Sequence, residues 1–528
     1  MIFFRRKLEL SKRFIRPLTQ VRADWSWLSA NSHWMSAVDA ARGNNGKKIL
    51  ISTMTGSNWA CSSFDSLLGI ALTLRGHEVQ YLLCDGILDA CQECDFQRIS
   101  PRELTEVGPQ NKLCVDCFSP ANKMLSGQKL RVNQLSKYLN GFNKIEAAKK
   151  YSAISHSSAG VLRFFGKADA TDETLFRPIY DRFETAYLKS RYAVEKLIDE
   201  EKFDCLIAHH GIYVPQGACV DAFEKRHLSV VTWNPGYKTG TFLFSHQKSY
   251  HYTMPKEDKQ SFENKISIRK KTQIINYLEL KKSGVGDWIK FYPRFQASRE
   301  RGKTPENFEY VFGLFSNVNW DAQVHFENSV FENQTEWIVD TINFFIKKPS
   351  YKLIIRIHPA EHLGSVPSRE PLIKIISDNF TILPDNIEII EPESKISSYV
   401  IAKEIDIALV YGSKIGIELA CKGIQVVVSG ECWGRNKGFT IDVVSKTHYL
   451  KILKKPRAFY LPKKVMTDNA LSYAYYLFFE RSIFVALAKP LKAFGVFKIV
   501  CNSLEEIRNC NGLNSIVDAI ETGRPFKN

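Results

Sequence analysis

The sequence lacks any run of about 20 uninterrupted apolar residues, the length that a helix needs to cross a bilayer. It also lacks a secretory signal, because Arg5, Arg6 and Lys7 directly follow its short apolar start. Its 12 cysteines among 528 residues do not form the pattern of a disulfide scaffold. We therefore expect a cytoplasmic protein with reduced thiols and no transmembrane helix.

Acidic residues are in deficit, since 56 Asp and Glu stand against 72 Lys and Arg, and the formal net charge is +16. Such a surplus predicts an acidic partner: a nucleic acid, an anionic lipid or a phosphorylated small molecule. Two segments that mix basic and apolar residues, 3–21 and 471–500, suit an interfacial helix on anionic lipid. The alternative for both is an amphipathic helix packed on the protein's own core.

The sequence contains no internal repeat and no extended low-complexity tract, and its length predicts two large domains. An apolar run at 47–56, a helical pattern at 64–74 and a second apolar run at 79–84 predict a βαβ unit. Strands and helices continue to alternate in both halves of the chain. The remaining strands are expected at 205–208, 229–235, 310–317, 352–359, 387–392, 405–412 and 425–430. Helices are expected at 181–200, 216–224, 335–346, 397–403 and 414–422.

This alternation predicts an α/β fold with two doubly wound, Rossmann-like domains that face each other across a cleft. The expected segments are a basic amphipathic N-terminal segment, a first domain with a cysteine-rich insert, a linker, a second domain and a C-terminal helical segment. Their ranges are 1–45, 46–250 with the insert at 84–117, 251–305, 306–460 and 461–528.

The strongest local motif is YGSKIGIE at 411–418, where an apolar strand ends in a Gly-Ser turn that opens a helix. Unpaired amides at a helix start suit a phosphate, and Gly412 lets the backbone approach it closely. Ser413 can cap the helix or bind a phosphate oxygen, and Lys414 adds a positive charge. Glu418, one turn later, is placed to accept hydrogen bonds from ribose hydroxyls. The alternative is an ordinary strand-to-helix turn with a serine cap.

Two further segments are expected at the same edge of the second sheet. Arg356, His358 and Glu361 follow a strand that Pro359 ends, and Arg and His suit a diphosphate. The loop at 434–440, with Lys437, would face the same cleft. The alternatives are a surface cluster for the first segment and a solvated loop for the second.

The cysteines of the insert form two pairs, Cys91 with Cys94 and Cys114 with Cys117. This spacing predicts a structural zinc site closed by four thiolates, with Cys84 as a substitute ligand. Unliganded thiols, an iron–sulfur cluster or a redox pair are the alternatives. A closed site of this kind leaves no open position for catalysis.

Three residues of the first half are candidates for a general base. His209 and His210 follow a predicted strand, and adjacent strand residues point to opposite faces, so at most one of them faces a substrate. Asp65, after the turn at 56–58, is the rival, and Glu361 of the second half is a weaker one. For each histidine, the alternative is a structural or exposed side chain.

Four segments of the second half resemble the capsule-type glycosyltransferases of bacterial surface-polysaccharide synthesis, a family that includes Kdo transferases. In family order they are FSNVNWDAQ at 315–323, RIHPAE at 356–361, YGSKIGIELACKG at 411–423 and GRNKGFTID at 434–442. YAYYLFFER at 473–481 is also similar, and the likeness covers about 305–485. In the first half, residues 55–79 look like the opening βαβ unit of a GT-B acceptor domain.

The resemblance implies a GT-B glycosyltransferase whose second domain binds a nucleotide-sugar donor and whose first domain binds a glycan or lipid-linked acceptor. It implies catalysis without a metal ion, and a product that is a capsule, an O-antigen or a similar glycan. With the net charge, it also implies peripheral contact with the inner face of the cytoplasmic membrane. The alternatives are a nucleotide-sugar epimerase on the same frame and a non-catalytic nucleic-acid-binding protein. The latter is not expected, because no zinc-finger helix or RNA-binding motif is recognisable.

Overall fold

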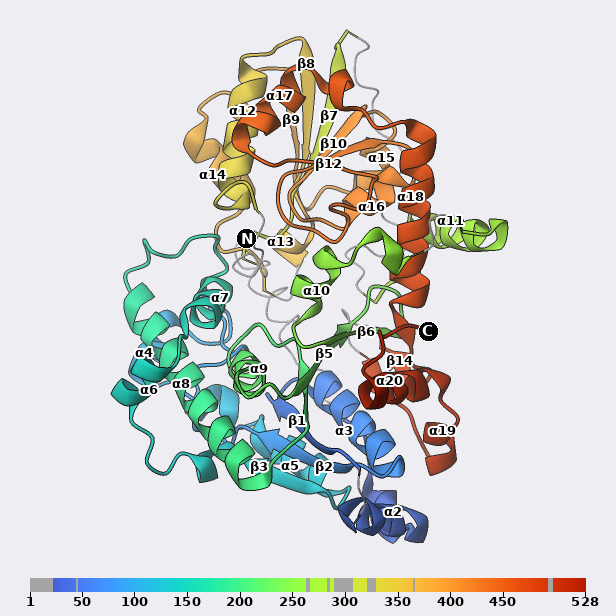
Figure 1. Ribbon diagram of the computed structural model, residues 1–528. Coiled ribbons are helices and arrows are strands. Elements are labelled where there is room, and N and C mark those ends of the chain that lie inside the picture. The colour runs from blue at the N-terminus through green and yellow to red at the C-terminus, as the bar shows by residue number, and fades with distance from the viewer. Residues whose placement is uncertain are drawn as a thin grey trace, which may run out of the picture.

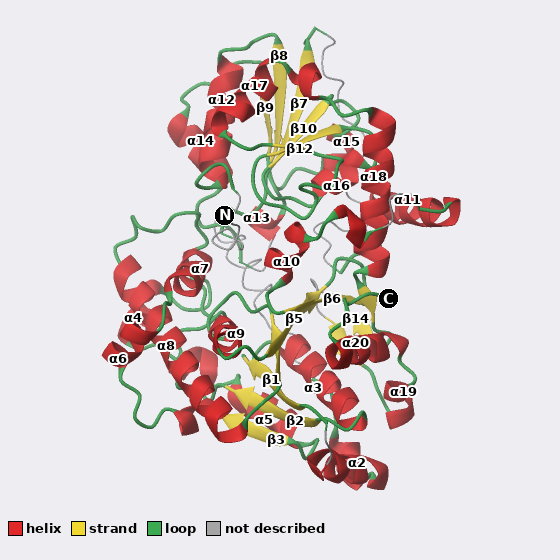
Figure 2. Cartoon of the chain, viewed as in Figure 1, coloured by secondary structure: helices red, strands yellow, loops and turns green. Residues whose placement is uncertain are grey.

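The computed structural model describes residues 22–43, 46–262, 266–282, 285–288, 307–320, 329–363, 366–491 and 497–528. They form two lobes, each a sheet with helices on both faces (Figures 1 and 2). The predicted interfacial segment at 3–21 lies outside these residues. Among the described helices, none is both long and apolar enough to cross a membrane.

The N-lobe contains a seven-stranded sheet in the order β13-β6-β5-β4-β1-β2-β3. The five parallel strands are β1 (Lys48–Met54), β2 (Glu78–Leu83), β3 (Arg131–Gln134), β4 (Cys205–His209) and β5 (Ser229–Pro235). Two antiparallel pairings complete one edge, between β5 and β6 (Thr241–His246) and between β6 and β13 (Ile483–Phe484). β1 and β4 are buried along almost their whole length, as expected for strands with helices on both faces.

Helices form a separate hydrophobic core on each face of this sheet. One face carries α2 (Ser32–Gly43), α3 (Trp59–Leu74), α5 (Phe118–Ser126), α19 (Leu504–Arg508) and α20 (Asn511–Thr522). The other carries α4 (Pro101–Glu106), α6 (Lys144–Lys150), α7 (Ile154–Phe165), α8 (Phe176–Glu201) and α9 (Gln216–Lys225). α3 is buried along almost its whole length, because it lies between the sheet and the returning C-terminal segment.

The C-lobe contains six parallel strands in the order β12-β11-β10-β7-β8-β9. They are β7 (Tyr310–Phe315), β8 (Tyr351–Arg356), β9 (Ile387–Ile390), β10 (Ile407–Val410), β11 (Gln425–Val428) and β12 (Ile441–Asp442). Its helices are α12 (Gln334–Ile346), α13 (Ala360–Leu363), α14 (Leu372–Asn379), α15 (Ser398–Ile401), α16 (Ile415–Ala420), α17 (Lys446–Lys454) and α18 (Lys463–Tyr475). This sheet also separates two hydrophobic cores. The predicted pair of doubly wound domains is therefore confirmed.

Two segments connect the lobes. α10 (Tyr250–Lys256) and α11 (Ile268–Lys282) follow the N-lobe sheet, and Figure 1 shows α11 projecting from the side of the molecule. After α18 the chain returns to the N-lobe through β13 and a small hairpin of β14 (Ala488–Pro490) and β15 (Phe497–Ile499). Leu471, Tyr473 and Leu477 are buried, so the apolar side chains at the start of segment 471–500 pack in the core of the C-lobe.

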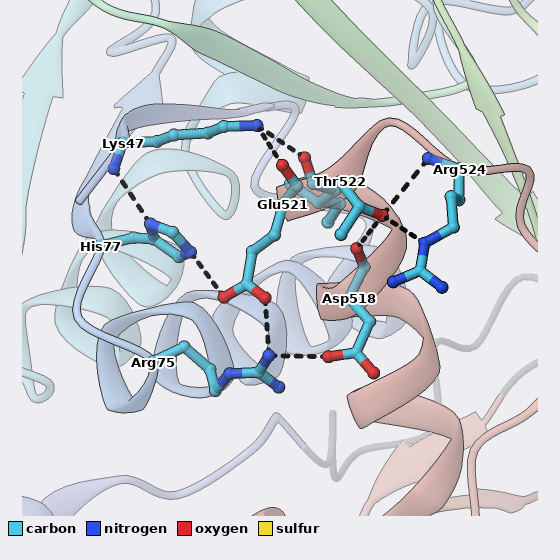
Figure 3. A network of polar contacts seen from close by, with 8 residues as sticks. Lys47, Arg75, His77, Asp518, Glu521, Thr522 and Arg524 are labelled. Carbon is cyan, nitrogen blue, oxygen red and sulfur yellow. Dashed lines mark hydrogen bonds and ion pairs between the residues drawn. The ribbon is translucent and has the colours of Figure 1, made fainter.

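The last helix, α20, is held on the N-lobe by a polar network (Figure 3). Lys47 Nζ donates hydrogen bonds to the carbonyl oxygens of Ile520 at 2.9 Å and Glu521 at 3.0 Å. The Glu521 carboxylate lies 3.0 Å from His77 Nε2 and 2.6 Å from Arg75 Nη2. A C-terminal segment that follows the second lobe in sequence thus belongs to the first lobe in space.

Candidate functional site

The candidate site lies where the carboxyl ends of the two sheets face each other. α13 follows β8 and α16 follows β10, and Figure 1 shows both helices on the side of the C-lobe next to the N-lobe. From the other side, the guanidinium of Arg163 in α7 lies 5.9 Å from the ring of Trp320, which follows β7. In each sheet, successive strands are added first to one side and then to the other, and this reversal lies next to β1 in the N-lobe and next to β7 in the C-lobe. Doubly wound sheets bind ligands at such points.

The Gly412–Ser413 turn joins β10 to α16. A Cβ atom on Gly412 would lie 2.9 Å from the Glu431 carbonyl oxygen, so this close approach requires glycine. Ser413 is half-buried and lines a small pocket together with Trp433, whose Nε1 has no hydrogen-bond partner among the described residues. The N-cap of α16 is Lys414, so the predicted serine cap is not formed. The phosphate-binding role of Ser413 stays a prediction.

Lys414 and Glu418 belong to a buried network of charges. Lys281 Nζ, from α11, lies 2.6 Å from Glu418 Oε1 and 2.9 Å from Asp287 Oδ2. Lys414 Nζ lies 3.3 Å from the same Asp287 oxygen and 3.4 Å from Glu418, and the Tyr399 hydroxyl donates a hydrogen bond to Glu418. Burial by itself would raise the pKa of Glu418. The charges of Lys281 and Lys414 outweigh burial and lower the pKa to about 2. Glu418 is ionised among protein partners, and its predicted contact with ribose stays a prediction.

Arg356 and His358 hold the ends of three strands together. Arg356 is buried and donates hydrogen bonds to the backbone carbonyls that follow β9, including that of Ser394 at 3.3 Å. The backbone amide of His358 donates to Ser316 Oγ at 2.9 Å, which ties β8 to β7. Burial, together with the charges of Arg356 and Lys414, lowers the pKa of His358 to about 4, so its imidazole is neutral at pH 7. The diphosphate contacts predicted for Arg356 and His358 stay predictions.

Glu361 and Lys437 also contact the protein backbone. Glu361 is buried, accepts a hydrogen bond from the Leu372 amide at 3.0 Å, and has its pKa raised by burial to about 7. Lys437 Nζ donates to the carbonyl oxygens of Pro255 at 3.0 Å and of Glu257, at the end of α10. Lys437 therefore ties the 434–440 loop to the segment that leaves the N-lobe. Neither residue lines the pocket beside Ser413.

His209 and His210 lie at the carboxyl end of β4. His209 is 9% exposed, its ring lies 4.9 Å from that of Trp233, and its Nδ1 has no hydrogen-bond partner among the described residues. Burial lowers the pKa of His209 to about 4, although the charge of Glu93 opposes this. His210 has a left-handed backbone, with φ of 66°, and stacks on His251 at 5.2 Å. The His209 and His210 rings contact each other edge to face at 5.4 Å, so they do not point to opposite faces as expected for adjacent strand residues. The role of each stays a prediction.

Asp65 lies inside the N-lobe, in α3. Its side chain is 1% exposed and accepts a hydrogen bond from Trp233 Nε1 at 2.9 Å. Burial raises the pKa of Asp65 to about 7. The Asp65 carboxyl is already hydrogen-bonded to Trp233, so we do not include Asp65 in the function proposed below.

The four cysteines predicted to bind zinc lie in the described part of the insert. The 12 cysteines are free, and no group of three or more His, Cys, Asp or Glu side chains in the described ranges is arranged to hold a metal ion. The insert nevertheless lies at the site, because Cys117 Sγ accepts a hydrogen bond from the Ser57 amide at 3.2 Å, directly after β1. Zinc binding stays a prediction for these thiols, and no chemical step below depends on it.

Sequence reasoning missed several side chains of the N-lobe edge. Arg163 lies in a helix that carried no recognisable motif, and Trp320 lies in the segment FSNVNWDAQ at 315–323 but was given no role. Glu93 was passed over because it lies between two of the cysteines. Its carboxylate forms an ion pair with Arg98 at 2.8 Å. The available signal was a charged residue, Glu93, between two closely spaced cysteines.

No protein-family model and no curated protein sequence matches this chain. Among solved structures, KpsC of Thermosulfurimonas dismutans, a β-Kdo 2,4 transferase, has 10% sequence identity and a TM-score of 0.37, over 60% of this chain and 88% of its own. The β-Kdo 2,7 transferase KpsC of the same organism has 14% identity and a TM-score of 0.33, over 58% and 84%. Sucrose-phosphate synthase from Thermosynechococcus elongatus has 13% identity and a TM-score of 0.33, over 82% and 95%. The roles assigned below rest on the geometry of this chain.

Proposed function

We propose that the protein is a glycosyltransferase that moves a sugar from a nucleotide-activated donor on the C-lobe to an acceptor on the N-lobe. The observation that carries this proposal is that the carboxyl edges of two doubly wound sheets face each other. One edge has a half-buried pocket beside Ser413, and the other has His209 at a strand end. Such an arrangement suits a reaction between two substrates that must meet.

On the donor side, the residues that line the pocket include Ser413, Lys414, Trp433 and Thr440. Hydroxyl and indole N–H groups can donate hydrogen bonds to phosphate oxygens, and Lys414 adds positive charge near them. Arg356 and Lys437 act through the backbone segments that they hold, and they need not touch the donor. Stabilisation of the leaving phosphate by these groups requires no metal ion.

On the acceptor side, His209 is our candidate for the base. The acceptor hydroxyl oxygen bonds to the anomeric carbon of the donor sugar while the bond from that carbon to the phosphate oxygen breaks. The nucleotide leaves with that electron pair, and the hydroxyl proton passes to His209. Its imidazole is neutral at pH 7, because burial lowers its pKa to about 4, and the negative charge of Glu93 favours the protonated product.

A surface polysaccharide as product, and peripheral contact with an anionic membrane, are the finer parts of this proposal. Support for them comes from the motifs in the second half of the sequence and from the net charge of +16. Flotation with vesicles tests the membrane contact. We expect more protein on phosphatidylserine vesicles than on neutral phosphatidylcholine vesicles, and equal flotation would contradict it.

A nucleotide screen by thermal unfolding tests the donor site. We expect one of UDP, GDP, CMP and dTDP to raise the unfolding temperature in a concentration-dependent way. The variant Ser413→Glu should weaken this binding at least about tenfold, because its carboxylate repels a phosphate. Ser445→Glu is the matched control, since Ser445 caps α17 outside the pocket.

Two outcomes contradict the proposal. One is that none of the nucleotides stabilises the protein, or that Ser413→Glu responds as the parent protein does. The other is that the enzyme converts a free nucleotide sugar to an isomer without any acceptor.

A further inference from the structure

The loop between Cys91 and Cys94 places two polar side chains at the carboxyl edge of the N-lobe sheet. The Gln92 amide donates a hydrogen bond to the Val214 carbonyl at 2.8 Å, and its side chain donates to Thr55 Oγ1 at 2.9 Å. Glu93 follows and forms an ion pair with Arg98 at 2.8 Å. The hydrogen bonds of Gln92 thus hold the segment that carries Glu93 beside the end of β1.

Arg163 approaches the same place from α7. Its guanidinium lies 5.8 Å from the ring of Tyr213 in the N-lobe and 5.9 Å from the ring of Trp320 in the C-lobe. Its Nη1 is buried and has no hydrogen-bond partner in the part of the chain that the structure describes. A buried guanidinium N–H without an acceptor is unfavourable, so an oxygen atom from a bound molecule would stabilise it.

Two further polar atoms of this edge are buried and lack partners within the described ranges: His209 Nδ1 and Gln216 Oε1. Their residues are 9% and 2% exposed, and the buried Ser57 hydroxyl lies beside the Glu93 carboxylate. Gln216 is fixed next to Gln92, because both side chains donate to Thr55 Oγ1. A native interior satisfies nearly all of its buried polar groups, so a group of such atoms at one sheet edge is suited to hydrogen bonds with a bound molecule.

The charges around these atoms are balanced. Arg98 and Arg163 both act on Glu93 and Asp95, which gives two positive and two negative side chains. An anionic ligand would therefore bring an unpaired charge into a buried place, which is costly. A ring with several hydroxyl groups can both donate and accept hydrogen bonds, and its apolar face can pack on an aromatic ring.

We propose that Ser57, Glu93, Arg163, His209 and Gln216 form a binding site for an uncharged sugar ring of the acceptor. This inference rests on the glycosyltransferase function proposed above and specifies the substrate class of its acceptor side. Arg163, Gln216 and Ser57 bind ring hydroxyls, and one hydroxyl faces His209. Trp320 closes the site from the C-lobe, so the sugar is held between the two lobes.

Saturation-transfer NMR with matched sugars tests the ligand class. The probes are the methyl glycosides of glucose, galactose, mannose and N-acetylglucosamine, each compared with its counterpart that carries a carboxylate at C6. We expect saturable binding of at least one neutral glycoside, and weaker binding of its charged counterpart. Tighter binding of the charged member of every pair, or saturable binding of none of the neutral glycosides, would overturn the proposal.

Substitution of Arg163 tests the position of the site. Arg163→Gln should weaken binding of the neutral glycoside about tenfold or more, because a charge-assisted hydrogen bond is lost. Arg182→Gln is the matched control, since Arg182 binds the Thr105 carbonyl elsewhere in the same lobe and should leave binding unchanged. Equal binding by Arg163→Gln and the parent protein counts against the site.

The same variants distinguish the two proposals. The nucleotide-induced rise in unfolding temperature should be unchanged in Arg163→Gln, because Arg163 does not line the pocket beside Ser413. If a nucleotide stabilises the protein while no neutral sugar binds, the acceptor site is wrong and the donor site stands. If neutral sugars bind while no nucleotide does, the proposed transferase function is wrong.

Discussion

The two lobes share one architecture but use the polar side chains at their carboxyl edges differently. In the C-lobe, Arg356, Lys437 and Glu418 bond to backbone carbonyls or to other charged side chains. In the N-lobe, Arg163 and His209 have buried nitrogen atoms without partners among the described residues. Charged residues that look like ligands in a sequence can therefore be structural, and an atom with spare hydrogen-bonding capacity, such as Arg163 Nη1, can belong to a residue that carries no motif.

The difference follows from where partners are available. A buried charge needs an opposite charge or hydrogen bonds, and the C-lobe obtains both from outside its own sheet. Lys281 and Asp287 come from the segment that joins the lobes, and Glu257 follows α10. The Lys414 side chain also lies 4.3 Å from the ring of Tyr237, which follows the N-lobe strand β5. The charged groups near the Gly-Ser turn thus hold the lobes together.

The largest expected effect tests whether the N-lobe edge is the catalytic one. His209→Gln should lower kcat for sugar transfer by about 10²–10⁴-fold, the usual contribution of a general base, and should leave the donor KM unchanged. Steady-state kinetics with the donor identified by the nucleotide screen would measure both. His210→Gln is the matched control, since His210 stacks on His251. Loss of activity in His210→Gln but not in His209→Gln would show that His209 is not the base.

The second largest effect tests whether the C-lobe charges are structural. Glu418→Gln leaves Lys281 and Lys414 with one carboxylate between them, and loss of one partner of a buried pair costs about 3–5 kcal/mol of unfolding free energy. The double variant Lys281→Met, Glu418→Gln keeps Lys414 with Asp287 and should recover much of that loss. Urea unfolding of both variants would measure the difference.

An exposed pair on the same helix is the control for the buried network. Lys282 pairs with Glu279, and their side chains are 37% and 55% exposed. Lys282→Met should change the unfolding free energy by no more than about 1 kcal/mol, because solvent screens exposed pairs. If the double variant is as unstable as the sum of its single variants, Lys281 and Glu418 are not coupled and the network is not a unit.

Much of the fold could be predicted from the sequence, because its central strands are buried on both faces. Such strands are continuous apolar runs, and β1, β4, β8 and β10 were each expected within a few residues of their bounds. β6 and β13 were missed because they pair at the edge and antiparallel, and their alternation is weak. β13 lies 237 residues after the end of β6, and no local pattern reports a pairing over that distance.

The candidate site could be predicted only in part. Residues at predicted strand ends were expected at the carboxyl edges of the two sheets, and the structure places them there, since carboxyl ends of parallel strands meet by topology. The partners of those residues could not be predicted, because Lys281 and the Glu257 carbonyl belong to the connecting segment, which is rich in lysine and weakly periodic. A missing hydrogen-bond partner, as at Gln216 Oε1, is a property of the folded chain alone.

The third prediction concerns the pH dependence of the unfolding free energy, through one buried carboxyl group in each lobe. Burial raises the pKa of Asp65 from 3.8 to about 7 and that of Glu361 from 4.5 to about 7. Each stays protonated in the native state while it ionises in the unfolded state above its ordinary pKa. Its stabilising contribution is therefore complete below pH of about 4 and is lost as the pH rises to about 7, by about 1.4 kcal/mol per unit of pH for each group.

The variants Asp65→Asn and Glu361→Gln remove this dependence one lobe at a time. Urea unfolding at several pH values between 5 and 8 should show a flatter decline in stability for each variant than for the parent protein. Asp39→Asn is the control, since the Asp39 side chain is 71% exposed. An unchanged slope in Asp65→Asn would mean that its carboxyl is already ionised in the folded protein, and would reopen it as a candidate base.

The smallest expected effect concerns an ion pair between the lobes. Arg369 Nη1 of the C-lobe lies 3.1 Å from Glu173 Oε2 of the N-lobe, and the Arg369 amide donates to the Gly166 carbonyl at 3.1 Å. Arg369→Gln removes only the charge, so the unfolding free energy should fall by less than about 1 kcal/mol, and salt should reduce the difference. Arg226→Gln, which breaks an ion pair with Asp199 inside the N-lobe, should show a loss of similar size. If Arg369→Gln lowers the unfolding free energy much more than Arg226→Gln does, the lobes do not separate easily. The arrangement that buries Arg163 beside Trp320 then persists without substrate.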